Sequence, residues 1–162
     1  MKNIVSIRLK SSMWIHGNVV QVQYPGGIMQ INRYDYGAEF FALYNTHENW
    51  FHFPMPTPVI IDDSRPKLVK VFVFYNAVGN TKINELRVYD GPRRVKAFEN
   101  LNWSGDHGSG VQSENSRTID PPETIFFGLG ISVRVTLKYD LESPRSERIV
   151  FTSAGADFKP SS

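Results

Sequence analysis

The feature that most constrains the fold is a strict alternation of apolar and polar residues over positions 131–139, in the order Ile-Ser-Val-Arg-Val-Thr-Leu-Lys-Tyr. Successive side chains of a strand point to opposite faces, so this period of two predicts a strand with one buried and one solvated face. Residues 67–75 carry apolar side chains at odd and even positions alike, which predicts a central strand covered on both sides. Shorter runs predict further strands at 20–24, 86–88, 125–129 and 149–151.

Strong turn signals separate these runs, among them Pro25-Gly26-Gly27, Gly79-Asn80 and Asp90-Gly91-Pro92. A helical period is present only at 94–101, where apolar residues three apart predict a single helical turn. Strands at this spacing without long helices predict an all-β chain, which we interpret as a single-domain antiparallel β-sandwich of the jelly-roll type. We place the sandwich at residues 1–156 and a C-terminal tail at 157–162.

Two segments lack a strand pattern. Four prolines fall between residues 54 and 66. Because proline has no N–H for a sheet ladder, this stretch predicts a stiff crossing from one sheet to the other. Residues 102–122 are rich in Gly, Ser and Asn and predict a long loop, of the kind that often carries function.

Composition excludes several classes of protein. At 162 residues, with 41% hydrophobic and 21% charged residues, the chain is long enough for one well-packed domain. A net charge of +2 argues against binding nucleic acid, and the chain has no run near the ~18 apolar residues needed to span a membrane. The absence of cysteine excludes disulfides and thiolate ligands. Residues 1–8 also lack the apolar core of a signal peptide, so we expect a soluble cytoplasmic protein.

Each of the three tryptophans lies close to a histidine. Two pairs have the pattern Trp-x-His, at 14–16 and 50–52, and such residues share one face of a strand. Ligand pockets are mostly apolar and aromatic, with a few polar groups that orient the ligand. The sequence therefore predicts non-catalytic binding of a small organic or carbohydrate ligand in a Trp/His-lined pocket. The predicted ligand-binding residues are Trp14, His16, Asn18, Trp50, His52, Trp103, Asp106 and His107.

Other interpretations stay open. The tryptophans can be ordinary core residues, with the histidines at strand ends. A small enzyme, such as an isomerase, cyclase or hydrolase, can use His16, His52 or His107 as general acid or base beside Asp106. The same side chains can bind a metal, but no metal-binding motif supports this, and we expect neither a metal nor a cofactor. Aromatic residues in segment 32–36 can form a homodimer interface.

Several strings along the chain also occur together in one family. They are WIHGN at 14–18, FHFP and PTPV within 51–59, VYDG at 88–91, GDH at 105–107 and SAGADF at 153–158. With these strings the chain resembles a family of small single-domain microbial proteins that is classed as a domain of unknown function. The resemblance implies a compact all-β domain and brings no activity, ligand or catalytic residue.

Overall fold

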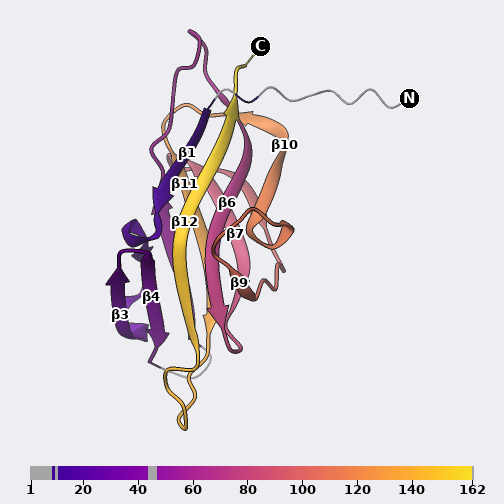
Figure 1. The fold of residues 1–162 in the computed structure, drawn as a ribbon. Helices are drawn as coiled ribbons and strands as arrows, with labels where there is room; N and C mark the ends of the chain where they lie inside the picture. Colours follow the sequence, from indigo (N-terminus) through magenta and orange to yellow (C-terminus); the bar gives the residue numbers. More distant parts are fainter. Residues whose placement is uncertain (1–8, 10, 44–46, 162) are drawn as a thin grey trace, which may run out of the picture.

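The computed structural model describes residues 9, 11–43 and 47–161, and most of them lie in antiparallel strands (Figure 1). In chain order the strands are β1 (Ser11–His16), β2 (Gln21–Val22), β3 (Ile28–Tyr34), β4 (Gly37–Ala42), β5 (His47–Pro54), β6 (Lys67–Val78), β7 (Lys82–Asp90), β8 (Arg93–Phe98), β9 (Gly105–His107), β10 (Ser116–Thr124), β11 (Leu129–Leu137) and β12 (Arg148–Lys159). Between them lie the short 3-10 turns η1 (Gly17–Val19), η2 (Pro25–Gly27) and η3 (Ser113–Asn115).

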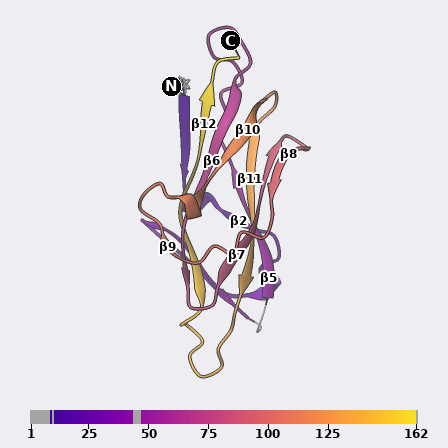
Figure 2. The same ribbon diagram turned by 90° about the vertical axis from the view of Figure 1, so that its right-hand side faces the viewer.

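The strands form two sheets that lie as separate layers (Figure 2). The seven-stranded sheet follows the path β10-β6-β12-β4-β3, with β1 beside β12 and β9 beside β6. The five-stranded sheet has the order β2-β5-β11-β7-β8. The recorded strand pairs are antiparallel, and many join strands far apart in the sequence. This is a jelly-roll-like β-sandwich, and it confirms the predicted all-β class.

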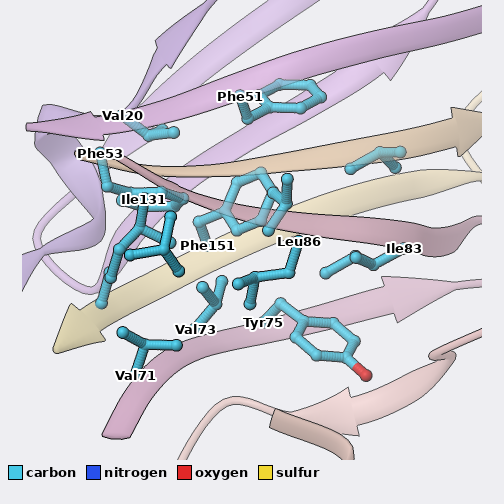
Figure 3. Close-up of a cluster of buried hydrophobic side chains, with 14 of the residues drawn as sticks. Val20, Phe51, Phe53, Val71, Val73, Tyr75, Ile83, Leu86, Ile131 and Phe151 are labelled. Atoms are coloured by element: carbon cyan, nitrogen blue, oxygen red, sulfur yellow. The ribbon is translucent and has the colours of Figure 1, made fainter. Parts of the chain in front are cut away.

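The inward faces of the two sheets share one hydrophobic core. Phe51 and Phe53 of β5 pack against Phe151 of β12, with ring centroids 5.1 and 5.2 Å apart, and Ile131 lies beside them (Figure 3). The alternation at 131–139 explains how β11 serves this core. Its apolar residues are buried between the sheets, while its polar side chains point to the outer face, as predicted.

Strand β6 is the central strand predicted at residues 67–75, with β12 on one side and β10 and β9 on the other. Its outer face carries Phe72 and Phe74, whose ring centroids lie 4.9 and 5.0 Å from that of Trp14 on β1. The indole fits because residue 155 of β12 is glycine, since a Cβ there would lie 2.4 Å from the Cδ2 atom of Trp14. Trp14 therefore covers the outer face of this sheet.

Two predictions about local structure are wrong. Residues 94–101 form no helical turn, because most of them lie in β8, which pairs with β7. Residues 125–128 connect β10 to β11 instead of forming a strand, which begins only at Leu129, and the carboxylate of Asp90 accepts from the backbone N–H groups of residues 126–128. In both places a tertiary partner decides the conformation.

Two further boundaries differ from the prediction. Segment 102–122 is not a long loop, since it contains β9, η3 and the first part of β10. Strand β12 continues to Lys159 through the expected start of the tail, because Phe158 is fully buried in the core. The proline-rich stretch at 54–66 does lead from β5 in one sheet to β6 in the other, as predicted.

Candidate functional site

The outer face of the five-stranded sheet carries a polar and aromatic cleft. Strand β11 lies between β5 and β7, and the register places Ser132 beside His52 on one side and Arg87 on the other. The next outward residue of β11 lies beside Trp50. Here the surface is hollowed into a cleft of about 560 Å³. Side chains that line it include Gln23, Trp50, His52, Arg87, Tyr89 and Ser132.

Trp50 is the main aromatic group of the cleft. Its indole is half-buried, and the guanidinium carbon of Arg87 lies 4.5 Å from its ring centroid in a cation–π contact. Arg87 is in turn held by Glu85, with its Nε atom 2.5 Å from the carboxylate Oε1. These contacts fix the orientation of the indole. Among the described residues, the indole N–H of Trp50 has no hydrogen-bond acceptor, so it can donate to a ligand.

A row of alternating charges borders the cleft. The Nη1 atom of Arg134 lies 2.9 Å from Glu48, and its Nε atom lies 3.2 Å from Glu85, which also binds Arg87. Two carboxylates and two guanidinium groups thus neutralise one another in pairs. The row offers many hydrogen-bonding groups without a net charge that would attract an ion of either sign.

His52 links two other polar groups of the cleft. Its Nδ1 atom lies 2.7 Å from the Ser132 hydroxyl and its Nε2 atom 2.8 Å from the side-chain oxygen of Gln23. The amide oxygen only accepts, so neutral His52 carries its hydrogen on Nε2 and accepts from Ser132 through Nδ1. Burial lowers the pKa of His52 below its ordinary value, so the imidazole is neutral at pH 7.

Gln23 reaches His52 because the chain around β2 is tied to β5. The N–H of Gln23 donates to the carbonyl of Trp50 at 2.8 Å. The side chain of Asn49, which is fully buried, accepts from the N–H of Tyr24 at 3.0 Å and donates to its carbonyl at 2.8 Å. The Asn49 side chain thereby makes the two hydrogen bonds that the backbone of a neighbouring strand would make to Tyr24. It holds this edge of the cleft in position.

Ser132, His52 and Gln23 are linked by hydrogen bonds in the way that the catalytic groups of a hydrolase are. Ser132 would be the nucleophile, His52 the base and Gln23 the group that orients the base. Two features disfavour acyl transfer. Gln23 is uncharged and does not stabilise the imidazolium that general-base catalysis produces. Ser132 lies in mid-strand between β5 and β7, so neighbouring N–H groups serve the two ladders instead of an oxyanion hole. This arrangement suits binding better than catalysis.

Three of the predicted site residues lie at the N-terminal end of the fold. Trp14 lies on the outer face of the seven-stranded sheet, 39% exposed, and donates from Nε1 to Ser12 at 2.9 Å. His16 caps η1, where its Nδ1 atom accepts from the N–H of Asn18 at 3.2 Å. The Asn18 side chain donates to the carbonyl of Tyr34 at 2.5 Å. These contacts secure β1 and the end of β3.

The three predicted residues between 103 and 107 have structural partners as well. Trp103 is 4% exposed and stacks on Tyr75, with ring centroids 6.1 Å apart, while the guanidinium carbon of Arg117 lies 4.6 Å from its ring centroid. The Nε2 atom of His107 lies 2.9 Å from a backbone carbonyl three residues earlier. Asp106 accepts from a backbone N–H two residues later at 3.2 Å, which closes a turn.

The single pocket expected from three Trp-His pairs is therefore not formed. Of the predicted set, Trp50 and His52 line the cleft, whereas Trp14 packs on the other sheet and Trp103 belongs to the core. The histidines at 16, 52 and 107 lie on β1, β5 and β9. Among the described residues, no three His, Asp or Glu side chains have an arrangement that could hold a metal ion.

The sequence interpretation missed Gln23, Arg87, Tyr89 and Ser132 in the cleft. Arg87 and Ser132 stood in recognised strand patterns, as the polar partners of buried apolar residues in β7 and β11. Gln23 stood in the predicted strand at 20–24, and Tyr89 lay one residue beyond the run at 86–88. Their alternation assigns them to an outer face, but the strand order that brings β5, β11 and β7 together is a long-range property.

Two further expectations concern a homodimer and a membrane. Tyr34 and Tyr36 are exposed and stack on one another with ring centroids 5.0 Å apart, at the segment considered for a homodimer. In the part of the chain that the structure describes, none of the helices is long and apolar enough to cross a membrane. The homodimer and the cytoplasmic location stay predictions.

The fold and the cleft together define a β-sandwich domain with a polar and aromatic recess on the outer face of one sheet. The chain belongs to the family of unknown function DUF6623, whose model matches residues 9–161, and this confirms the resemblance drawn from the sequence strings. A comparison with curated proteins gives no match.

Solved structures of similar fold include a low-affinity xylan-binding module, CBM86, from the gut symbiont Roseburia intestinalis, with TM-score 0.46, 15% identity, and coverage of 93% of this chain and 97% of that chain. Another is the C-terminal CBM6 module of a laminarinase from Zobellia galactanivorans, with TM-score 0.46, 9% identity, and coverage of 90% and 99%. A third is a CBM36 module in complex with calcium and xylotriose, with TM-score 0.39, 11% identity, and coverage of 90% and 98%. Likenesses at this level carry no argument about function.

Proposed function

We propose that the chain binds a neutral carbohydrate, without catalysis, in the cleft on the outer face of the five-stranded sheet. The observation that carries the proposal is the half-buried indole of Trp50, fixed by Arg87 beside a set of hydrogen-bonding side chains in a recess of about 560 Å³. A sugar ring has apolar C–H faces and a rim of hydroxyl groups. It therefore needs a flat aromatic surface and polar groups around it.

The electrostatics of the cleft favour an uncharged ligand. The carboxylates and guanidinium groups along its border are already paired, and His52 is neutral at pH 7 because burial lowers its pKa. An anionic ligand would have to compete with Glu85 for Arg87. A hydroxyl group can instead donate to a carboxylate or accept from a guanidinium without separating the pair.

The proposal is tested with a panel of linear oligosaccharides, each as a disaccharide and a hexasaccharide, derived from cellulose, xylan, mannan, chitin and laminarin. Isothermal titration calorimetry of the wild-type chain should find at least one hexasaccharide that binds. Trp50→Ala should weaken that binding about tenfold or more, because the buried aromatic group of such a site carries much of the free energy. Gln23→Ala, at an exposed position, should weaken it severalfold.

Trp14→Ala is the matched control, because it removes the same ring from the outer face of the opposite sheet. It should change the affinity less than about twofold, and circular dichroism should verify that both tryptophan variants are folded. The proposal fails if no hexasaccharide of the panel binds. It also fails if Trp14→Ala abolishes binding while the folded Trp50→Ala and Gln23→Ala variants bind as wild type.

A further inference from the structure

A second and larger cleft lies near the other end of the same strands. It has a volume of about 1100 Å³, and its lining includes Lys82 and Asn84 of β7, Thr136 of β11, and Lys138 and Tyr139 just after β11. The cleft around Trp50 is lined by Arg87 and Tyr89 of the same β7 and by Ser132 of the same β11. The two clefts therefore follow one another along β7 and β11, and the second also reaches the end of the opposite sheet, where Leu43 follows β4 and Glu147 precedes β12.

The register gives the spacing of the two clefts. On β11 the outward positions run from Ser132 in the first cleft through Arg134 to Thr136 in the second. At about 3.3 Å per residue, Ser132 and Thr136 are roughly 13 Å apart along the strand. On that strand a single outward residue separates the clefts, so one elongated ligand can occupy both.

The surface between the clefts is polar. It consists of the ion-paired row in which Arg134 binds Glu48 at 2.9 Å and Glu85 at 3.2 Å. The Glu48 side chain is half exposed and that of Arg134 nearly one-third exposed, so both present hydrogen-bonding atoms to solvent. A chain bearing hydroxyl groups can cross such a row with its polar groups satisfied, whereas an apolar chain would leave the charges desolvated.

The second cleft has the same chemical character as the first. The side-chain amide nitrogen of Asn84 donates to the Thr136 hydroxyl at 2.5 Å, which leaves the amide oxygen as an acceptor in the lining of the cleft. The charged residues of its lining have both signs, with Lys82 and Lys138 opposed by Asp140, Glu142 and Glu147. As in the first cleft, no single charge dominates.

We infer that the ligand is a linear oligosaccharide that lies along β11 and β7, with its first part at Trp50 and a later part in the cleft at Asn84 and Thr136. The inference rests on the proposed carbohydrate binding and adds the length and direction of the ligand. A disaccharide fills the first cleft, while a hexasaccharide reaches the second. Affinity should therefore increase with chain length up to the length that fills both clefts.

The test compares the disaccharide and the hexasaccharide of the glycan from the panel that binds the wild-type chain. By calorimetry the hexasaccharide should bind about tenfold or more tightly than the disaccharide. The double variant Asn84→Ala/Thr136→Val should lose most of this gain. Its affinity for the disaccharide should stay within about twofold of wild type, because neither residue lines the first cleft.

The matched control is Asn76→Ala/Thr118→Val, which makes the same changes on β6 and β10 of the opposite sheet and should keep the full gain. The extension is overturned, with carbohydrate binding retained, if both lengths bind equally or if the Asn84/Thr136 variant keeps the gain. If no hexasaccharide of the panel binds, both the proposed function and the extension fall. Thermal melting of each variant verifies that a loss is not due to unfolding.

Discussion

Asp90 anchors the connection between β10 and β11, which leads into the strand at the floor of the cleft. Its carboxylate, fully buried at the end of β7, accepts from the backbone N–H groups of Phe126, Phe127 and Gly128 at 3.0, 2.9 and 3.1 Å. Burial, the largest single influence, would raise the pKa of Asp90. The three backbone hydrogen bonds, together with Arg93, outweigh it and hold the pKa below its ordinary value.

The substitution Asp90→Asn keeps the size of the side chain and removes its charge. Hydrogen bonds to a charged acceptor contribute about 1.5–3 kcal/mol each, and those to a neutral acceptor about 0.5–1.5 kcal/mol. The two bonds to Oδ1 would each weaken by about 1 kcal/mol, and the bond from Phe126 to Oδ2 would be lost to an amide N–H₂ group. We therefore expect the free energy of unfolding at pH 7 to fall by about 3–5 kcal/mol.

The pH dependence provides a second readout from urea unfolding. Because the folded chain holds the pKa of Asp90 below that of the unfolded chain, this stabilisation is fully present above about pH 4 and is lost as the pH falls through the folded-state pKa. The difference between wild type and Asp90→Asn should therefore shrink toward about pH 3. A difference below about 1 kcal/mol at pH 7, or one that is equal at both pH values, would refute the reasoning. Asp35→Asn, at an exposed position, is the control and should stay within about 0.5 kcal/mol of wild type.

Two further changes address the histidine of the cleft and the cover of the other sheet. Because burial lowers the pKa of His52, thermal stability should decrease as the pH falls below about 6.5, and His52→Gln should show a smaller decrease, measured by melting at several pH values. Gly155→Val should lower the free energy of unfolding by about 1–3 kcal/mol in urea, because any Cβ at 155 overlaps the indole of Trp14. Gly26→Ala, where a Cβ meets nothing within 4 Å, should have almost no effect, and an equal loss in both glycine variants would contradict this account.

Much of the fold could be predicted from the sequence because the strands are half-buried and carry their pattern locally. The alternation at 131–139 and the double-sided run at 67–75 each gave the correct strand and the correct burial of its faces. The errors fell where a partner outside the segment decides the structure. Strand β8 forms a hairpin with β7, the strand just before it, and the end of β12 is ordered because Phe158 enters the core.

The candidate site was harder to predict for a related reason. The spacing Trp-x-His correctly places two side chains on one face of a strand, but it does not say which sheet that face belongs to or what covers it. Trp14 and Trp50 share the pattern, yet one lies on Phe72 of the seven-stranded sheet and the other in the cleft of the five-stranded sheet. Strand order, which no local pattern encodes, separates them.

The cleft is built largely on paired strands, and this has a consequence for how fast a ligand exchanges. Trp50, His52, Arg87 and Ser132 stand on three strands joined by continuous ladders, so their backbone positions are set before any ligand arrives. Little ordering entropy is then lost on association, and no gate has to open. We expect rapid association and release, seen as averaged resonances in nuclear magnetic resonance titrations. Crystals of the free protein should also take up an oligosaccharide by soaking without damage to the lattice.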